Sequence, residues 1–505
     1  MLVTGKHISV VHTITMMIIM TDHLVSMADK NIPDRKQTVR KPEQIHLSMG
    51  SRINDFYVMW ATKTDEDCYV EYGTGSETFT KANSKKIELT EQSDKAAKFV
   101  HRAELLNLSP GTRYSYLFVC SLSGTRTEKF TFDVPHSDPQ KQHRFVVLAD
   151  VGLLTKSLQF MVHEVLNGGY EAVFHIGDIA YNLDTQGGSV GDEYMNKISN
   201  FTTRVPYMTT PGDHERFSDF YHYRYRFSMP NSPWPMREDS LWYSIDIGHT
   251  HFISINTELL PPSRLNLLQF TWLKSDLINA NRNRKATPWI IVMGHKPLYC
   301  TKSVMQQECD QDRYPLREQL EDLFFEQGVD LYMSGHKHCY ERSWPMYLGR
   351  VFQTDTINPT APIHIITGAT GYEYLVDKQY SRPFWLAFAA SDGDKELYAR
   401  LTVLNETHLI WSVHAVLTNE KVEDLLVIQK HHGSFGKAGP SAFSNIHVEA
   451  NKRDHLPPEP FYLVDVQTEN QFRRIVLYSI VVILSFILFA FLRNTNVRKR
   501  LRLRW

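Results

Sequence analysis

Five apolar segments of this 505-residue chain each run into an aspartate or a histidine with a glycine close by. Each segment is long enough to be a buried strand, and the polar side chain follows directly after it. Carboxylates and imidazoles without any thiolate are donors that suit iron, zinc or manganese. The pattern therefore predicts a metal-dependent site, with its candidate ligands in Ala149-Asp150-Val151-Gly152, Gly177-Asp178-Ile179-Ala180-Tyr181, Gly212-Asp213-His214-Glu215, Gly294-His295 and Ser334-Gly335-His336-Lys337-His338.

The segments around these residues have the pattern of an α/β domain. Short apolar runs alternate with stretches that we expect to be helical, such as 157–167, 265–281 and 316–327. Open α/β sheets bind their ligands outside the carboxyl ends of the strands. We therefore expect the five strand endings to converge on one crevice, although they are far apart in the sequence.

Each of these endings, taken alone, has an ordinary structural explanation. A single Gly-Asp after a strand is typical of a turn or a helix cap, and a single Gly-His is typical of a hydrogen-bonded core histidine. His336 and His338 are more specific, because alternate residues at an extended strand end share one face. Five endings in order favour the metal interpretation. A carboxylate shared by two ions would hold them about 3.5–4 Å apart, which suits the cleavage of a phosphate ester.

The ordered set resembles the five motifs of the metallophosphoesterases, and the tyrosine of Gly177-Asp178-Ile179-Ala180-Tyr181 resembles that of the purple acid phosphatases. The resemblance is to their high-molecular-weight form and covers about residues 40 to 415. It implies an all-β sandwich, fibronectin type III-like, followed by an α/β metallophosphoesterase domain of two mixed sheets flanked by helices. It also implies an acid phosphatase that hydrolyses phosphate monoesters by a metal-bound hydroxide. The implied cofactors are Fe³⁺ and a second divalent ion, Zn²⁺, Fe²⁺ or Mn²⁺.

The resemblance also implies a role for each motif residue. Asp150, Tyr181 and His338 would bind the ferric ion. The purple colour of the family arises from charge transfer between a tyrosinate and iron, and the resemblance assigns that tyrosinate to Tyr181. Asp178 bridges the two ions, and His214 is the catalytic residue that contacts the phosphate and stabilises or protonates the leaving group. The full set of implied metal ligands is Asp150, Asp178, Tyr181, Asp213, His295, His336 and His338.

Two departures from the family pattern leave a second function open. The third motif usually has asparagine where this chain has Asp213, and the added negative charge should bind the second ion more tightly while repelling a phosphate dianion. The loop at 296–312 lacks the substrate histidine that plant-type members place there. The alternative function is a metal-loaded but weakly active membrane-anchored protein whose fibronectin-like domain serves binding or adhesion.

Residues 40–136 have the pattern of the predicted β-sandwich. Short runs with two-residue alternation, at 56–61, 68–72, 115–120 and 129–132, are separated by turn residues. The turn and strand at 108–114 resemble a fibronectin type III corner. After a polar linker we expect the metallophosphoesterase catalytic domain at 140–415, followed by a stalk at 433–472.

Composition places the chain among ordinary globular proteins. Hydrophobic residues make up 42% and the formal net charge is −1, so the chain lacks the basic excess of most nucleic-acid binders, and we expect no nucleic-acid partner. Five cysteines cannot all pair within one chain. Cys300 and Cys309 close a short loop and form the most plausible disulfide. A second pair, Cys68 with Cys120, would leave Cys339 free.

The two ends of the chain predict a type I membrane protein of the secretory pathway. Residues 475–492 form an uncharged run that we expect to be a transmembrane helix, and the basic tail at 493–505 places the C-terminus in the cytosol. Residues 1–28 are expected to be a signal peptide, which leaves the catalytic domain lumenal or extracellular. Which membrane holds the anchor and the oligomeric state stay open. Predicted glycosylation sites are Asn107, Asn200 and Asn405.

Overall fold

The structure is a computed structural model, and it describes residues 41–75, 79–90, 98–138, 140–153, 155–259, 265–301, 306–371, 382–390 and 395–437, with backbone only at 306–314. The chain divides into two compact units, Met1–Ile446 and His447–Trp505, and all described residues belong to the first. The predicted signal peptide, most of the stalk, the transmembrane helix and the tail lie outside the described residues. Within the described ranges, no helix is long and apolar enough to cross a membrane.

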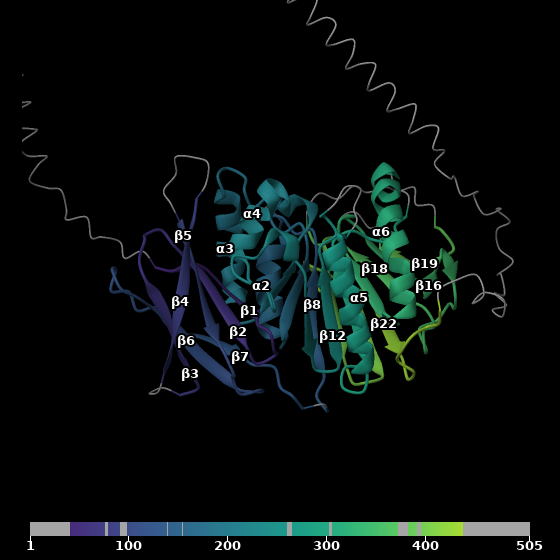
Figure 1. Cartoon of the computed structure of the whole chain (residues 1–505), viewed down its shortest axis with the longest axis horizontal. Coiled ribbons are helices and arrows are strands. Elements are labelled where there is room, and N and C mark those ends of the chain that lie inside the picture. Colours follow the sequence, from purple (N-terminus) through teal and green to yellow (C-terminus); the bar gives the residue numbers. More distant parts are fainter. Residues whose placement is uncertain are drawn as a thin grey trace, which may run out of the picture. The chain divides into compact units, whose positions relative to one another are not determined.

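The N-terminal domain is an antiparallel β domain, as predicted (Figure 1). One long strand, β4 (Thr80–Leu89), changes partners along its length: Thr80–Asn83 pairs with β3 (Cys68–Gly73), and Ser84–Leu89 pairs with β5 (Lys98–Leu105). Neighbouring strands are hydrogen-bonded to each other in the order β1-β2-β5-β4-β3-β6-β7. Their bounds are β1 (Glu43–Met49), β2 (Phe56–Thr62), β3 (Cys68–Gly73), β4 (Thr80–Leu89), β5 (Lys98–Leu105), β6 (Arg113–Cys120) and β7 (Phe130–Asp133).

Aromatic side chains fill the core of this domain. The ring of Trp60 on β2 packs against Phe118 on β6, with centroids 4.7 Å apart, and Phe56 packs against Phe132 on β7 at 4.9 Å. Such tilted pairs bury large apolar surfaces and add about 0.5–1.5 kcal/mol each beyond that burial. A disulfide joins Cys68 and Cys120 on the paired strands β3 and β6, which confirms the second predicted pair.

The α/β domain contains two mixed sheets and a two-stranded sheet, β16 (Met346–Tyr347) with β17 (Arg350–Val351). In the first sheet β8, β9 and β10 are parallel, and β20 pairs antiparallel with β8. Its order is β10 (Tyr207–Thr210), β9 (Ala172–Ile176), β8 (His143–Leu148), β20 (Leu397–Val403), β21 (His408–Ala415), β22 (Lys421–Ile428). The order of the second is β11 (Tyr243–Ile247), β12 (Thr250–Ile255), β13 (Trp289–Gly294), β14 (Leu331–Ser334), β18 (Ile363–Thr367), β15 (Tyr340–Ser343), β19 (Leu386–Ala390).

The two mixed sheets pack face to face. Phe252 on β12 contacts Phe145 on β8 and Phe174 on β9, with ring centroids 5.0 and 4.6 Å apart. The alternate residues of β12 and β13, such as Ile253 and Ile290, point the other way. There they pack against α5 (Leu267–Arg282) and α6 (Gln306–Glu326), which cover the outer face of the second sheet in Figure 1.

Two further helices, α2 (Ser157–Asn167) and α3 (Ser189–Thr202), belong to the core cluster that includes β8 and β9. The N-terminal domain contacts α3 through polar groups. Asp192 on α3 forms ion pairs with Lys98 on β5 and with Arg226 at the end of α4 (Phe217–Arg226), and it accepts a hydrogen bond from Gln44 on β1. This carboxylate therefore fastens the two domains to each other.

The predicted domain end at residue 415 is earlier than the end of the sheet, because β22 continues it to Ile428. The short helical turn η2 (Glu238–Ser240) precedes β11.

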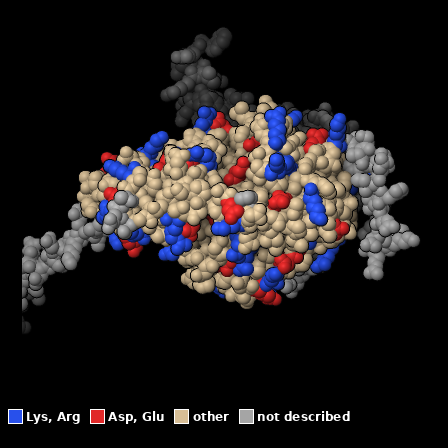
Figure 2. Space-filling model, turned by 90° about the horizontal axis from the view of Figure 1, so that it is seen from below, with Lys and Arg blue, Asp and Glu red and all other residues tan. Residues whose placement is uncertain are grey.

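On the face drawn in Figure 2, basic and acidic side chains are interspersed. That face therefore carries both signs of charge and not a patch of one sign.

Candidate metal centre

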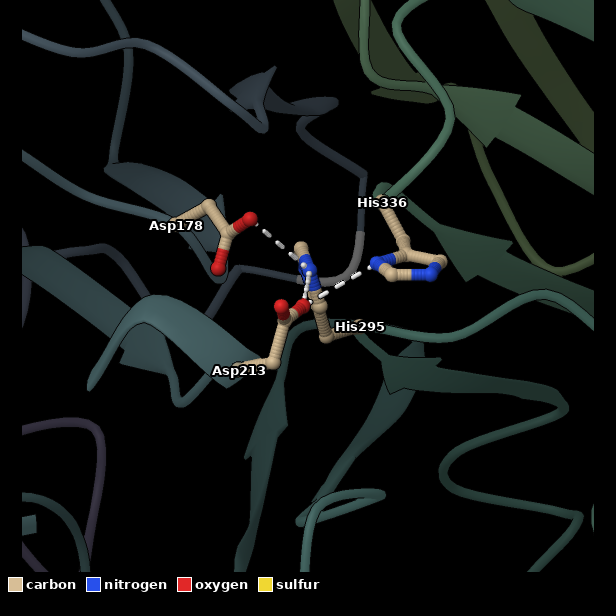
Figure 3. Close-up of side chains that lie close together, drawn as sticks. All are labelled: Asp178, Asp213, His295 and His336. Carbon is tan, nitrogen blue, oxygen red and sulfur yellow. Dashed lines mark hydrogen bonds and ion pairs between the residues drawn. The ribbon is translucent and has the colours of Figure 1, made fainter. Parts of the chain in front are cut away.

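The strand endings come together at the carboxyl ends of the strands. Figure 3 shows four of the predicted ligands, Asp178, Asp213, His295 and His336, pointing toward one another. One ligand atom from each lies within 4.8 Å of the others, which is close enough for a single metal ion. They come from the segments that follow four different strands, β9, β10, β13 and β14. We refer to these four residues as the Asp213 half of the centre.

His295 is fixed with one nitrogen toward the cluster. Its Nδ1 lies 2.9 Å from the carbonyl oxygen of Ile176, which can only accept, so Nδ1 carries the proton. Its Nε2 lies 3.3 Å from Asp178 and 3.2 Å from Asp213. Gly177 allows this approach, because a Cβ there would be 2.3 Å from Nδ1 of His295. An imidazole anchored through Nδ1 to a carbonyl is typical of metal ligands.

The other predicted ligands, Asp150, Tyr181 and His338, form the second half, which we call the Tyr181 half. The Tyr181 hydroxyl lies 3.0 Å from Asp150 Oδ1 and 2.8 Å from His338 Nε2. The second Asp150 oxygen accepts the backbone N–H of His336 at 2.9 Å, which connects the two halves. The structure therefore brings together all seven residues that the motifs predict as ligands.

Burial and neighbouring charges set the protonation of these groups. Burial alone would raise the pKa of Asp213, but its hydrogen bonds with His295 and His336 hold that pKa below the usual range. The pKa of Asp150 is lowered in the same manner, where the hydrogen bond with His338 opposes burial. Burial, followed by the charges of Asp150 and Asp178, raises the pKa of the Tyr181 phenol far above 10. Asp150 and Asp213 are therefore ionised, whereas the Tyr181 phenol ionises only beside a strong cation.

His214 lies beside the two halves, in the short turn η1 (Asp213–Glu215). Its Nδ1 is 2.6 Å from Oδ1 of Asn182, and its ring packs on Tyr181 with centroids 4.4 Å apart. Its Nε2 faces Asp178 at 4.0 Å, and the side chain is 38% exposed. This is the position of a group that meets a ligand entering from solvent. The sequence gives no signal for Asn182, because a lone asparagine after a motif has no distinctive spacing.

Glu215 is a positioning residue to which the sequence motifs assign no role. Its buried carboxylate accepts the backbone N–H groups of Asp178, Ile179 and Gly212 at 2.8–2.9 Å, which ties two of the metal-binding turns together. Burial and the charge of Asp178 raise its pKa to about 8. A signal was present in the sequence, since Glu215 follows Gly212, the residue that precedes the helical turn, by three positions, which is capping-box spacing.

The donor set fits a pair of metal ions. Two of its carboxylates, Asp150 and Asp178, are fully or almost fully buried, and buried carboxylates need a cation or several donors beside them. Oxygen and imidazole donors without thiolate suit iron, zinc or manganese. When bound, such ions polarise phosphoryl oxygens and lower the pKa of water. The arrangement is therefore suited to the hydrolysis of phosphate esters.

The other predicted sites are described in part. Asn107 and Asn200 are exposed, whereas Asn405 is half-buried and its Oδ1 accepts the backbone N–H groups of Thr407 and His408. Cys300 is disulfide-bonded, and its predicted partner Cys309 lies among the residues whose side chains the structure does not describe. Within the described part of the chain, Cys339 is the free cysteine, as the sequence predicted. Part of the 296–312 loop also lies outside the described residues.

Comparisons with known proteins define the class of this site. The family described as calcineurin-like phosphoesterase matches residues 143–340, which contain every strand ending of the centre. The purple acid phosphatase N-terminal domain matches residues 42–134, and the iron/zinc purple acid phosphatase-like protein C matches residues 361–425. The α/β domain is thus a metallophosphoesterase.

Whole-chain relatives narrow this class to one family. The chain is 35% identical to acid phosphatase type 7 of Danio rerio, over 78% of this chain and 92% of that protein, and equally identical to the Homo sapiens protein of that name. It is 26% identical to purple acid phosphatase 18 of Arabidopsis thaliana, over 76% of this chain and 83% of that protein. Its fold matches the purple acid phosphatase PPD1 of yellow lupin with a TM-score of 0.68, at 20% identity, over 77% of this chain and 75% of that one.

The chain belongs to the purple acid phosphatase family. It is an acid phosphatase, a hydrolase of phosphate monoesters with a binuclear metal site, as the motifs predicted.

Proposed function

We propose that this phosphatase holds a ferric ion in the Tyr181 half of its centre and a divalent ion, Zn²⁺, Fe²⁺ or Mn²⁺, in the Asp213 half. The contact of the Tyr181 hydroxyl with Asp150 and His338 carries this proposal. A phenol whose pKa is raised so far ionises beside a hard, highly charged cation, and Fe³⁺ is such a cation. Two carboxylates and two imidazoles in the other half suit a divalent ion.

Asp178 is the proposed bridge between the two ions. It belongs to the cluster of the Asp213 half, and its charge also raises the pKa of Tyr181, so it lies close to both halves. One of its oxygens, Oδ1, accepts the backbone N–H of His214 at 3.0 Å, which fixes the carboxylate plane. The other oxygen, Oδ2, faces His295.

His214 is the proposed catalytic residue. Since Oδ1 of Asn182 is an acceptor, the bonded Nδ1 of His214 carries a proton, and Nε2 is left to face the substrate. In its protonated form, Nε2 donates to a phosphoryl oxygen or to the leaving-group oxygen. Asn182 thus holds the ring in the orientation that this proton transfer requires.

The function is tested by hydrolysis of p-nitrophenyl phosphate after reconstitution with iron and zinc, with bound metal counted on the same sample. We expect turnover with an acidic optimum and a visible absorption band that disappears in Tyr181→Phe. The matched control is Tyr225→Phe, a half-buried tyrosine on α4. Two bound metals without turnover would refute the catalytic function and favour the weakly active binding protein.

We also propose that the chain is a type I membrane protein with its catalytic domain in a lumen or outside the cell, and that its N-terminal domain is a fibronectin type III-like sandwich. The uncharged run at 475–492 and the basic tail support the anchor. Carbonate extraction tests it: the full chain should stay with membranes, and a chain ending at residue 470 should not.

A further inference from the structure

A second group of potential metal ligands lies at the opposite ends of the strands that carry the catalytic centre. His143 is the first residue of β8, and Glu171 directly precedes β9. These strands are parallel neighbours, so their amino ends lie side by side as their carboxyl ends do. Asp150 and Asp178 follow at the carboxyl ends, about 20 Å away at 3.3 Å per residue. The two groups are therefore separate sites.

A third side chain, His136, reaches this group from the linker after β7. Its Nε2 lies 3.7 Å from Oε1 of Glu171, whereas Nδ1 of His143 lies 2.5 Å from Oε2. Each oxygen of Glu171 thus faces a different imidazole. One ligand atom from each of the three residues lies within 4.8 Å of the other two.

The spacing between His136 and Glu171 fits two ligands of one ion better than a hydrogen bond. At 3.7 Å the two atoms are too far apart for a hydrogen bond. Two ligands on a tetrahedral zinc ion, with bonds of about 2.0–2.1 Å, lie about 3.3 Å apart. The 2.5 Å contact between His143 and Glu171 is a hydrogen bond, so Nδ1 of His143 releases its proton to water when the ion binds. The Nδ1 atom of His136 is buried and has no hydrogen-bond partner among the described residues.

The surroundings of His143 direct its ring toward Glu171. Gly248, in the turn between β11 and β12, has a φ of +56°, and a Cβ there would lie 2.1 Å from Nε2 of His143. The Nε2 side of the ring is therefore closed by backbone, and Nδ1 is presented to the cluster. His143 is buried, whereas His136 and Glu171 are partly exposed, so an ion can enter from the linker side.

We propose that His136, His143 and Glu171 bind a Zn²⁺ ion outside the catalytic centre. Two imidazoles and one carboxylate are a common zinc donor set, and water completes the tetrahedron. Because His136 belongs to the linker between the domains, the ion fastens that linker to the amino ends of β8 and β9. Its role is structural, since the cluster lies far from the residues that meet the phosphate ester.

Counting metal in the full-length holoenzyme tests this proposal. We expect three ions per chain in the wild type and two in His136→Ala. The matched control is His163→Ala, an exposed histidine on α2, which should keep three. Turnover of p-nitrophenyl phosphate should stay within about twofold in all three proteins, because the catalytic ions are retained. With the catalytic centre already loaded, further zinc at about 100 times the Kd of the third site should raise the melting temperature by about 5 °C in wild type and control, but not in His136→Ala.

Glu171→Gln provides a second variant, because the amide keeps an acceptor for His143 but removes the charge that holds the ion. It should also lose the third ion. Two ions per zinc-saturated wild-type chain would overturn the proposal and leave a histidine–glutamate hydrogen bond. A third ion retained in both variants would overturn it too.

Discussion

His295 and His251 have similar neighbours in two different places of the α/β domain. Each imidazole lies between two aspartates, and the charges of those aspartates raise the pKa of each against the effect of burial, for His251 to about 9. In the metal centre, both carboxylates contact the same nitrogen of His295. At the edge of the second sheet, Asp246 contacts Nδ1 of His251 at 2.6 Å, and Asp276 contacts Nε2 at 2.9 Å.

This difference separates a binding site from an ion pair. Carboxylates that share one nitrogen converge on one point, where a metal ion can replace a proton. Carboxylates on opposite nitrogens are held apart by the ring, and a protonated imidazole satisfies both. His251 therefore forms a closed ion-pair group, whereas His295 needs further donors, which the other strand ends supply.

The largest effect is expected from Asp178→Asn. The amide removes the buried charge that both halves of the centre share, so we expect kcat/KM for p-nitrophenyl phosphate to fall more than about 10³-fold, with loss of bound metal. The matched change in the ion-pair group, Asp276→Asn, should leave kcat/KM within about twofold. If the two variants lose activity equally, the distinction between the two histidines is wrong.

His214→Asn tests whether the metal centre contains a proton donor for the reaction. The ion-pair group of His251 has no such role. We expect kcat to fall about 10²–10³-fold, because removing a general acid typically costs 10²–10⁴. The loss should be larger for an alkyl phosphate than for p-nitrophenyl phosphate, since the poorer leaving group depends more on protonation. An equal loss for both substrates would limit His214 to binding the phosphate.

Asp213→Asn removes one of the two carboxylates beside His295. The centre should bind its divalent ion less tightly, and kcat at saturating metal should rise about tenfold, because a neutral amide no longer repels the phosphate dianion. Steady-state kinetics across a zinc titration measure both effects. An unchanged or lower kcat would show that Asp213 suits the native enzyme.

The smallest effect, on stability alone, is expected from His251→Gln. The folded-state pKa of about 9 lies above the usual 6.5, so the ion-pair group stabilises the fold fully below pH 6.5 and progressively less as the pH rises through 9. We expect the free energy of unfolding of the variant to be about 2 kcal/mol lower than that of the wild type at pH 6 and nearly equal to it above pH 9.5. Urea unfolding at both pH values measures this. A difference that persists at high pH would mean that His251 acts through packing.

The sequence was sufficient for the metal centre because its ligands follow strands whose apolar runs are easily recognised. Parallel strands then bring such residues to one edge whatever their distance in the chain. The sequence was not sufficient to predict groups that act through hydrogen bonds between elements, such as Asn182, which accepts a hydrogen bond from His214. The ligands of the proposed zinc site, for example His136 and Glu171, lie on separate segments and form no motif. The strands from β15 to β22 are short or antiparallel, and their pattern did not show which sheet they join.

The pairing of β8 with β20 has a consequence for biosynthesis. Val147 on β8 pairs with Ala399 on β20, so the strand that leads to Asp150 has one unpaired edge until the chain has been made past residue 403. Contacts of such long sequence separation form late and slowly. An unpaired strand edge on a nascent chain can pair with other chains, which is a general cause of aggregation during synthesis. The first metal ligand is therefore synthesised early, but the strand that carries it is fully paired only after residue 403 has been made.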